Sequence, residues 1–303
     1  VWWGRQNKCP VGHTKVYAGK AAGKWHTHYG SGPNVQCMPP HHESSHYGYW
    51  GGNQNHGRMY MVEYHINGYG LEAAYRSDRT YKADEYTPWP YPWKRDYNLH
   101  DKEVPCTVCQ TPTNRPYDLM LPGRQDCPFE GWEVDYYGYL MATHYTHWGR
   151  VKQTCMDFQA EKATTWDDDD GTPQNLGWGD GNQGNDYFFP TEAEDIPGYN
   201  NNWEVTCAKC SSSGGPTYTR WGRRNCPAAS KKVYSGVGSG SWYTHWGGSY
   251  DALCMHTDPQ WRDFNTGDQN GALLYRMEYQ SGGLEDHDHL NDYDVPCAVC
   301  QVS

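Results

Sequence analysis

Short stretches in which apolar and polar residues alternate dominate the hydrophobic pattern of this chain. They are rich in Tyr, Val and Met and are bordered by Gly or Asn. Such alternation is typical of half-buried β-strands, whereas apolar residues at the 3.6-residue period of a helix are scarce. We therefore expect a mostly β protein with short antiparallel strands and many loops. The clearest strand candidates are 14–19, 57–66, 231–236 and 272–280.

The spacing of the cysteines recurs three times along the chain. In each third of the chain, two cysteines separated by a fixed interval precede one Cys-x-x-Cys pair ("CTVC", "CAKC", "CAVC"). The chain therefore contains three internal repeats. The interval is 28 residues in every case, from Cys9 to Cys37, from Cys127 to Cys155 and from Cys226 to Cys254.

Further motifs recur at matching places in the three repeats. Each repeat opens with Gly-Arg and a Cys-Pro, continues with a Tyr-x-Gly block, and has Met after its second cysteine. Between Tyr-x-Gly and Cys-Met each carries an aromatic hexamer, "WHTHYG", "HYTHWG" or "WYTHWG", which begin at Trp25, His144 and Trp242. The fourth residue of each hexamer is a histidine, namely His28, His147 and His245.

These motifs divide the chain into three predicted subdomains, 1–113, 114–213 and 214–303, called repeats 1, 2 and 3 below. Repeats 1 and 3 resemble each other more than either resembles repeat 2, which gives the order A–B–A. Repeat 1 contains an insertion at about 70–97, whose first part could form a short helix. Its second part, "TPWPYPW", is expected to be extended because alternate prolines exclude a helix. We interpret Trp89, Tyr91 and Trp93 in this loop as ligand or partner contacts.

Composition narrows the class of protein. The 303 residues carry a net charge of -11, which argues against binding to nucleic acid. No apolar run is long enough to span a membrane. The chain begins with Val1, which we interpret as the processed end of a secreted protein or, equally, as a trimmed end. Tyr and Trp are abundant and Phe is rare, so aromatic side chains with a polar atom are expected at half-buried positions.

The twelve cysteines have three possible interpretations, namely disulfide bridges, zinc sites, and free or redox-active thiols. An even number of cysteines, four in each repeat, fits a bridged extracellular protein. Four cysteines around a zinc ion in each repeat is the alternative, since Cys-x-x-Cys is a good half-site, although no second Cys-x-x-Cys completes it. Spacing alone does not choose among the three pairings that four cysteines allow.

The combination "CP…GxTxVYxG…CM…VPCxVC", followed by "LMLPGRQDCPFEGWEVDYYGYLMATH", resembles the short-chain, spongin-type collagens of sponges and related invertebrate secreted proteins. More distantly it resembles the non-collagenous C-terminal domain of type IV collagen. The resemblance covers the whole chain in its cysteine frame and is most specific over 104–157. It implies compact, antiparallel β subdomains that exchange a hairpin with a neighbour, and a role in extracellular assembly.

The resemblance also implies a disulfide pairing, in which the first cysteine of a repeat bonds to the last and the second to the third. The chain departs from type IV collagen in three respects. It has no Gly-x-y stretch, it lacks the third bridge of the collagen subdomain, and it has three units where the collagen domain has two. The implied pairs are Cys9–Cys109, Cys37–Cys106, Cys127–Cys210, Cys155–Cys207, Cys226–Cys300 and Cys254–Cys297.

Several groups of residues are candidate metal ligands, and each group could instead have a purely structural role. If the repeats pack around a pseudo-threefold axis, His28, His147 and His245 could converge on a zinc or copper ion. Alternatively each hexamer is a turn in which the rings pack and the glycine takes a positive φ. The runs "HHESSH" (41–46), "LEDHDHLNDYD" (284–294), "WDDDDG" (166–171) and "GDGNQGND" (179–186) are candidates for calcium or a transition metal, or are solvated loops.

The sequence contains no phosphate-binding loop, Gly-x-Ser-x-Gly elbow, zinc-protease motif or dinucleotide fingerprint. We therefore expect a secreted, non-enzymatic structural or extracellular-matrix protein that contacts matrix partners, glycans or further copies of itself. A lectin that uses Trp and Tyr against sugar faces is the alternative, and a metal-binding protein is the third.

Overall fold

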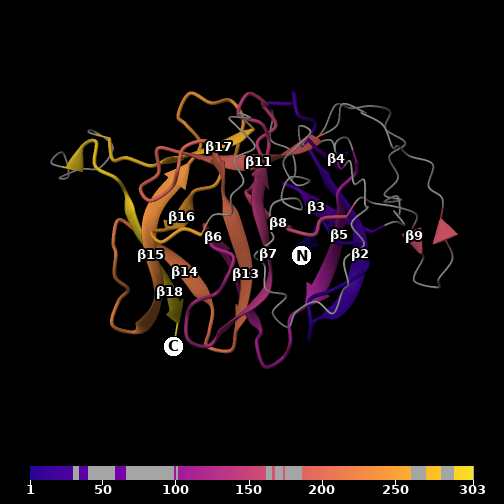
Figure 1. The fold of residues 1–303 in the computed structure, drawn as a ribbon, viewed down its shortest axis with the longest axis horizontal. Coiled ribbons are helices and arrows are strands. Elements are labelled where there is room, and N and C mark those ends of the chain that lie inside the picture. Colours follow the sequence, from indigo (N-terminus) through magenta and orange to yellow (C-terminus); the bar gives the residue numbers. More distant parts are fainter. Residues whose placement is uncertain are drawn as a thin grey trace, which may run out of the picture.

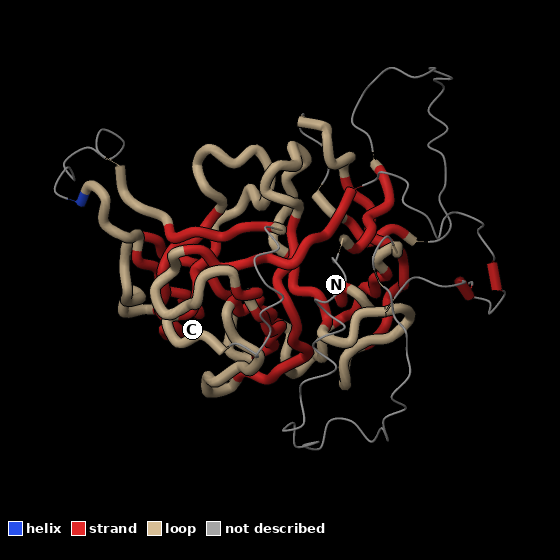
Figure 2. Tube along the Cα trace, turned by 45° about the horizontal axis from the view of Figure 1, so that its top comes forward, coloured by secondary structure: helices blue, strands red, loops and turns tan. Residues whose placement is uncertain are grey.

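The computed structural model describes residues 1–29, 34–39, 59–65, 99, 102–161, 166–167, 173–174, 186–260, 271–280 and 290–302. As expected, the protein is mostly β, with strands joined by turns and loops (Figure 2). The four sequence segments singled out above all contain strands. Within the described residues, no helix is long and apolar enough to cross a membrane.

The strands follow the three repeats. Repeat 1 contains β1 (Trp2–Trp3), β2 (Thr14–Gly23), β3 (Gln36–Met38), β4 (Tyr60–Tyr64) and β5 (Pro105–Gln110). Repeat 2 contains β6 (Tyr117–Pro122), β7 (Trp132–Ala142), β8 (Thr154–Asp157), β9 (Trp166–Asp167), β10 (Pro173–Gln174), β11 (Asp186–Glu194), β12 (Trp203–Glu204) and β13 (Thr206–Ser212). Repeat 3 contains β14 (Thr217–Trp221), β15 (Ser230–Gly240), β16 (Leu253–His256), β17 (Ala272–Arg276) and β18 (Pro296–Val302).

Every repeat has the same strand plan. A long strand (β2, β7 or β15) pairs antiparallel with the strand of the Cys-x-x-Cys pair (β5, β13 or β18). The strand of the second cysteine (β3, β8 or β16) pairs with the other edge of the long strand. The opening strand (β1, β6 or β14) lies on the outer edge of the Cys-x-x-Cys strand. The sequence repeat is therefore also a repeat of structure.

The Tyr-x-Gly motif joins the long strand of each repeat to the strand that carries the second cysteine, through a hydrogen bond and a close backbone contact. The hydroxyl groups of Tyr17, Tyr136 and Tyr234 donate hydrogen bonds to the carbonyls of Cys37, Cys155 and Cys254, at 2.9, 3.2 and 2.8 Å. Two residues further on, a Cβ on the glycine would overlap the carbonyl of the Met that follows the cysteine. Only glycine permits this approach, so the spacing of the motif has a packing reason. The three glycines are Gly19, Gly138 and Gly236.

Strands of different repeats pair in parallel, which the expectation of antiparallel strands did not include. The central strand β11 pairs through 186–188 with β4 and through 191–194 with β17. β1 pairs in parallel with β8 of repeat 2 at Trp3 and Met156. Figure 1 shows β17, β11 and β4 in succession across the top of the molecule, with repeat 3 and repeat 1 on opposite sides of repeat 2. The result is one continuous sheet that passes through all three repeats.

The hydrophobic core is also shared between repeats. One cluster joins Tyr64 and Val104 of repeat 1 to Met141 and Phe188 of repeat 2, all almost fully buried. A second joins Leu140 of repeat 2 to residues of repeat 3 such as Met255 and Leu274. The repeats therefore stabilise one another, and their existence as separate subdomains stays a prediction.

All twelve cysteines form disulfides. The prediction of disulfide bridges is therefore confirmed, and the alternative of zinc sites is wrong. The bridges join the pairs that the family resemblance implied. In each repeat the first cysteine bonds to the last and the second to the third, and every bridge lies within one repeat.

Candidate functional site: the hexamer row

Each aromatic hexamer is a tight turn that follows the long strand of its repeat. The backbone N–H of the histidine donates a hydrogen bond to the carbonyl of the first hexamer residue, at 2.9 Å in all three repeats. In repeat 2 the Nδ1 atom of His144 also contacts the hydroxyl of Thr146 at 2.8 Å. The interpretation of the hexamer as a structural turn is confirmed.

We call β4, β11 and β17 the central strands of repeats 1, 2 and 3. The first and fourth residues of each hexamer pack against one aromatic side chain of the central strand of the same repeat. The first ring, of Trp25, His144 or Trp242, lies 4.9 Å in each case from the ring of Tyr60, Phe189 or Tyr275. The fourth ring, of His28, His147 or His245, lies edge-on to the same aromatic at 5.8, 5.3 and 5.5 Å. Each histidine therefore fills the corner between the turn and the central strand of its repeat.

The hexamers also contact one another in chain order and form a row. The second residue of one hexamer packs on the histidine of the next, as His26 on His147 at 4.9 Å and Tyr145 on His245 at 4.8 Å. Gly149 and Gly247 donate backbone hydrogen bonds to the carbonyls of the same two residues, at 3.0 and 2.7 Å. The contact between hexamers is therefore made twice with the same geometry. We call this set of turns, residues 25–29, 144–149 and 242–247, the hexamer row.

The fifth residues lie along the outside of the row. The ring of Tyr29 lies 5.5 Å from that of Trp148, which in turn lies 4.0 Å from that of Trp246. Trp148 is 41 % exposed and Trp246 is 57 % exposed. The row thus presents a line of aromatic rings to solvent.

The hexamer glycine is required for a reason other than the predicted positive φ. Neither Gly149 nor Gly247 has a positive φ, so that prediction is wrong for both. A Cβ on Gly149 would lie 2.6 Å from the carbonyl oxygen of Trp25, and one on Gly247 would lie 2.0 Å from that of His144. The glycine therefore allows the backbone of one repeat to approach the turn of the previous one.

Burial lowers the pKa of three histidines in repeats 2 and 3 of the row, which favours their neutral forms. Desolvation, with smaller effects from neighbouring histidines, lowers the pKa of His144 to about 4 and that of His147 to about 3. Desolvation, with a smaller effect from the Arg150 guanidinium, also lowers the pKa of His245. Neutral imidazoles can serve as metal ligands, but the described residues contain no group of three or more His, Cys, Asp or Glu that could hold a metal ion.

The Gly-Arg motif forms a second contact between successive repeats. The carbonyl of Gly4 accepts a hydrogen bond from the N–H of Glu161 in repeat 2, and that of Gly123 accepts one from Gln260 in repeat 3, at 2.6 and 2.7 Å. The Arg5 side chain reaches Gln159 and Glu161 in the same loop of repeat 2.

In the next junction the Arg124 side chain donates to the carbonyl and the carboxylate of Asp258, at 2.6 and 2.7 Å. The recurrence of Gly-Arg in the sequence is the signal from which these contacts could have been sought. The recurrence of the motif does not by itself indicate that Gly-Arg contacts the following repeat.

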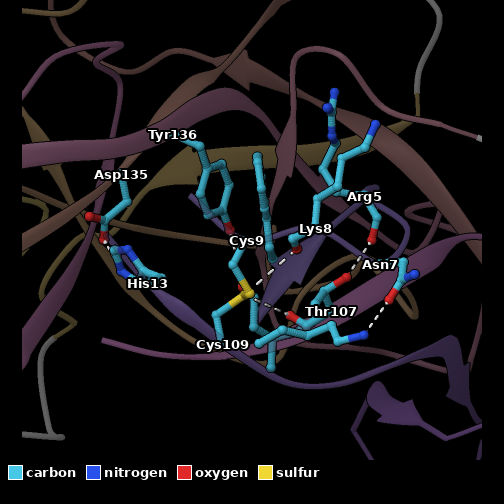
Figure 3. Close-up of a disulfide and its surroundings, with 12 residues drawn as sticks. Arg5, Asn7, Lys8, Cys9, His13, Thr107, Cys109, Asp135 and Tyr136 are labelled. Carbon is cyan, nitrogen blue, oxygen red and sulfur yellow. Dashed lines mark hydrogen bonds and ion pairs between the residues drawn. A yellow bond between two sulfur atoms is a disulfide. The ribbon is translucent and has the colours of Figure 1, made fainter. Parts of the chain in front are cut away.

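A buried polar pair adds to the contact between repeats 1 and 2. Figure 3 shows His13 pointing toward Asp135, close to the bridge between Cys9 and Cys109. The His13 Nε2 atom lies 3.5 Å from a carboxylate oxygen of Asp135, and both side chains are almost fully buried. Desolvation raises the pKa of Asp135, while the hydrogen bond from Ser211 and the charge of His13 oppose that shift. The polar residues of this region therefore hold neighbouring repeats in register.

Several candidate sites from the sequence lie outside the described residues. They are Trp89, Tyr91 and Trp93, the run at 41–46, and most of the acidic runs at 166–171, 179–186 and 284–294.

Compared with family models and with curated proteins, the chain has no significant match.

Proposed function

We propose that this protein is a secreted structural protein of the extracellular matrix, built from three homologous subdomains, that acts by assembly and not by catalysis. Six disulfides support an extracellular location, because such bridges persist in oxidising compartments. The single observation that carries the proposal is the repeated junction. The same backbone and ring contacts join repeat 1 to repeat 2 and repeat 2 to repeat 3.

Repeated junctions of this kind are the property expected of an assembly module. Each repeat offers one surface to the repeat before it and a different surface to the repeat after it. Solenoid proteins use such nearest-neighbour contacts to build extended, rigid binding surfaces. The expected partners are matrix proteins, matrix glycans or further copies of the chain.

Deposition into matrix tests the proposal. The chain would be expressed behind a secretion leader in cultured animal cells, and its distribution between medium and detergent-insoluble matrix measured. We expect a large share in the insoluble fraction, and little from a variant with both Cys155→Ser and Cys207→Ser. A chain that stays entirely in the medium, although folded and bridged, would count against a matrix function.

A lectin is the second candidate, and the exposed rings of Tyr29, Trp148 and Trp246 favour it. Aromatic faces beside polar groups can pack on the apolar faces of sugars. A glycan array with wild-type protein and Trp148→Ala tests this candidate. Binding that a free sugar competes away and that the substitution abolishes would favour the lectin over the matrix protein.

A further inference from the structure

The junction between repeats is made twice inside the chain, and among the described residues repeat 3 and repeat 1 each carry one matching junction surface that faces no other repeat. Repeat 3 exposes the surface that repeats 1 and 2 use to hold the repeat after them. Repeat 1 exposes the surface that repeats 2 and 3 use to hold the repeat before them. Figure 1 places repeat 3 and repeat 1 on opposite sides of repeat 2. Three separate contacts show that the exposed surface of repeat 3 is the same as the surfaces used internally.

The hexamer row gives the first contact. In repeats 1 and 2 the second hexamer residue, His26 or Tyr145, packs on the histidine of the next hexamer. The matching residue of repeat 3 is Tyr243, which is 87 % exposed. Among the described residues its ring contacts that of Trp242, its own neighbour in the hexamer. The position that receives a histidine elsewhere in the row therefore faces solvent here.

The central strand gives the second contact. In repeat 2 the segment from Thr191 to Glu194 pairs with β17 of repeat 3, and Glu192 is fully buried beneath that junction. The matching segment of repeat 3 runs from Met277 to Gln280. One of its edges is bonded to 292–295, as Glu192 is bonded to Glu204 in repeat 2. Its other edge has no partner strand within the described ranges, and Glu278 is exposed.

The Gly-Arg motif gives the third contact. The Arg5 and Arg124 side chains are only 13 % and 8 % exposed, because each lies against a loop of the following repeat. The matching side chain in repeat 3 is Arg223, which is exposed and makes no ion pair with a described residue. All three internal contacts therefore have a counterpart on repeat 3 that contacts no other repeat within the described part of the chain.

Repeat 1 presents the complementary surface. Met156 and Met255, which follow the second cysteine of repeats 2 and 3, are almost fully buried. Gly4 of the preceding repeat lies directly over Met156. The matching Met38 is only half-buried, and Tyr29, whose matches Trp148 and Trp246 each lie against a ring of the preceding hexamer, is 81 % exposed.

We propose that the exposed face of repeat 3 binds repeat 1 of a second copy of this chain, head to tail, through the junction that the chain already makes twice. This rests on the proposed function in assembly and names its partner. The two surfaces are the two different sides of one interface, so they complement each other and neither is self-complementary. A contact of this heterologous kind closes into a ring or extends into a filament.

Self-association of single-face variants tests the proposal. Tyr243→Ala and Arg223→Glu together alter the face of repeat 3, and Tyr29→Ala alters the face of repeat 1. Sedimentation velocity of the secreted, bridged protein should show a concentration-dependent oligomer for wild type. We expect each altered face to weaken the association by about tenfold or more. Tyr250→Ala, which removes an exposed aromatic of repeat 3 next to the Ser249 bridge to repeat 2, is the matched control and should associate as wild type does.

Mixing the two kinds of variant separates head-to-tail binding from other modes. A chain altered only on repeat 3 keeps an intact repeat 1, and a chain altered only on repeat 1 keeps an intact repeat 3. The mixture should form a one-to-one heterodimer that grows no further, with an affinity like that of wild type, although each variant alone associates about tenfold or more weakly. A far-UV circular dichroism spectrum and a cooperative urea transition like those of wild type establish that each variant is folded.

Three outcomes would overturn the inference. They are a wild-type chain that stays monomeric, a Tyr29→Ala variant that still associates fully, or a mixture that forms no heterodimer. If self-association fails while deposition into matrix persists, the inference falls and the proposed function stands. If self-association is present and deposition fails, the reverse holds.

Discussion

Replacement of Gly247 by Ala is the most direct test of the hexamer row. The new Cβ would lie 2.0 Å from the carbonyl oxygen of His144, 2.3 Å from that of His147 and 2.6 Å from the backbone nitrogen of His147. These backbone atoms belong to one hydrogen-bonded turn, so no side chain can rotate to make room. The third hexamer must therefore move away from the second by about 1 Å or more to restore ordinary contact distances.

The cost follows from what the movement breaks. Gly247 and Gly248 donate hydrogen bonds of 2.7 and 3.0 Å to the carbonyls of Tyr145 and His144, and each is worth about 1 kcal/mol. The ring pair of Trp148 and Trp246, with centroids 4.0 Å apart, contributes about 1 kcal/mol more. We expect the free energy of unfolding to fall by about 3 kcal/mol, at the upper end of the cost of overpacking.

Equilibrium unfolding in urea with the bridges intact measures this free energy, and near-UV circular dichroism reports on the tryptophan pair. Gly240→Ala is the matched control in the same repeat. Its Cβ would meet only the Met277 side chain, at 3.8 Å, and its φ is not positive. The control should change stability by less than about 0.5 kcal/mol. Equal stability of Gly247→Ala and wild type would show that the hexamers are not in close backbone contact.

Three further results are expected. Burial lowers the pKa of His144 to about 4, so its neutral form stabilises the fold above its unfolded pKa of about 6.5, and this stabilisation is lost as the pH falls toward 4. Between about pH 7 and pH 5, the free energy of unfolding in urea should therefore fall by about 1 kcal/mol less in His144→Trp than in wild type. This substitution introduces the residue that the other two hexamers have at this position. An equal fall in the two proteins would show that His144 does not cause the pH dependence. Arg124→Met should lower stability by about 2 kcal/mol because it removes the hydrogen bonds that the buried Arg124 guanidinium donates to the carbonyl and the exposed carboxylate of Asp258 in the next repeat, while Arg223→Met should be neutral in the monomer; equal effects in thermal unfolding would contradict the assignment. Removal of one bridge by Cys155→Ser with Cys207→Ser should cost about 2–4 kcal/mol in calorimetry, and an unchanged transition would mean that the bridge constrains nothing.

The elements within a repeat were predictable from sequence because their signals are local or periodic. Alternation marked the strands around Tyr17 and Tyr275, and the cysteine spacing marked the repeats. The pairing of bridges needed the family resemblance, since spacing leaves three choices for four cysteines. The turn at each hexamer also followed from its composition.

The contacts between repeats were not predictable in the same way. Nothing in the sequence of β11 indicates that its two halves pair with different repeats, because the backbone groups that join two strands are the same for almost every residue. The need for glycine at Gly149 and Gly247 was expected, but its reason was wrong. Close approach of backbones is a tertiary property, whereas a positive φ is a local one.

The confinement of every disulfide to a single repeat has a mechanical consequence. A pulling force applied to the two ends of the chain meets covalent cross-links inside each repeat, whereas the described contacts between repeats are non-covalent, namely hydrogen bonds, ion pairs and packed side chains. The contacts between repeats should break first, one junction at a time, and each repeat should remain cross-linked by its two disulfides. A chain of this construction can lengthen under load and recover, because the parts that separate are those that re-form without chemistry.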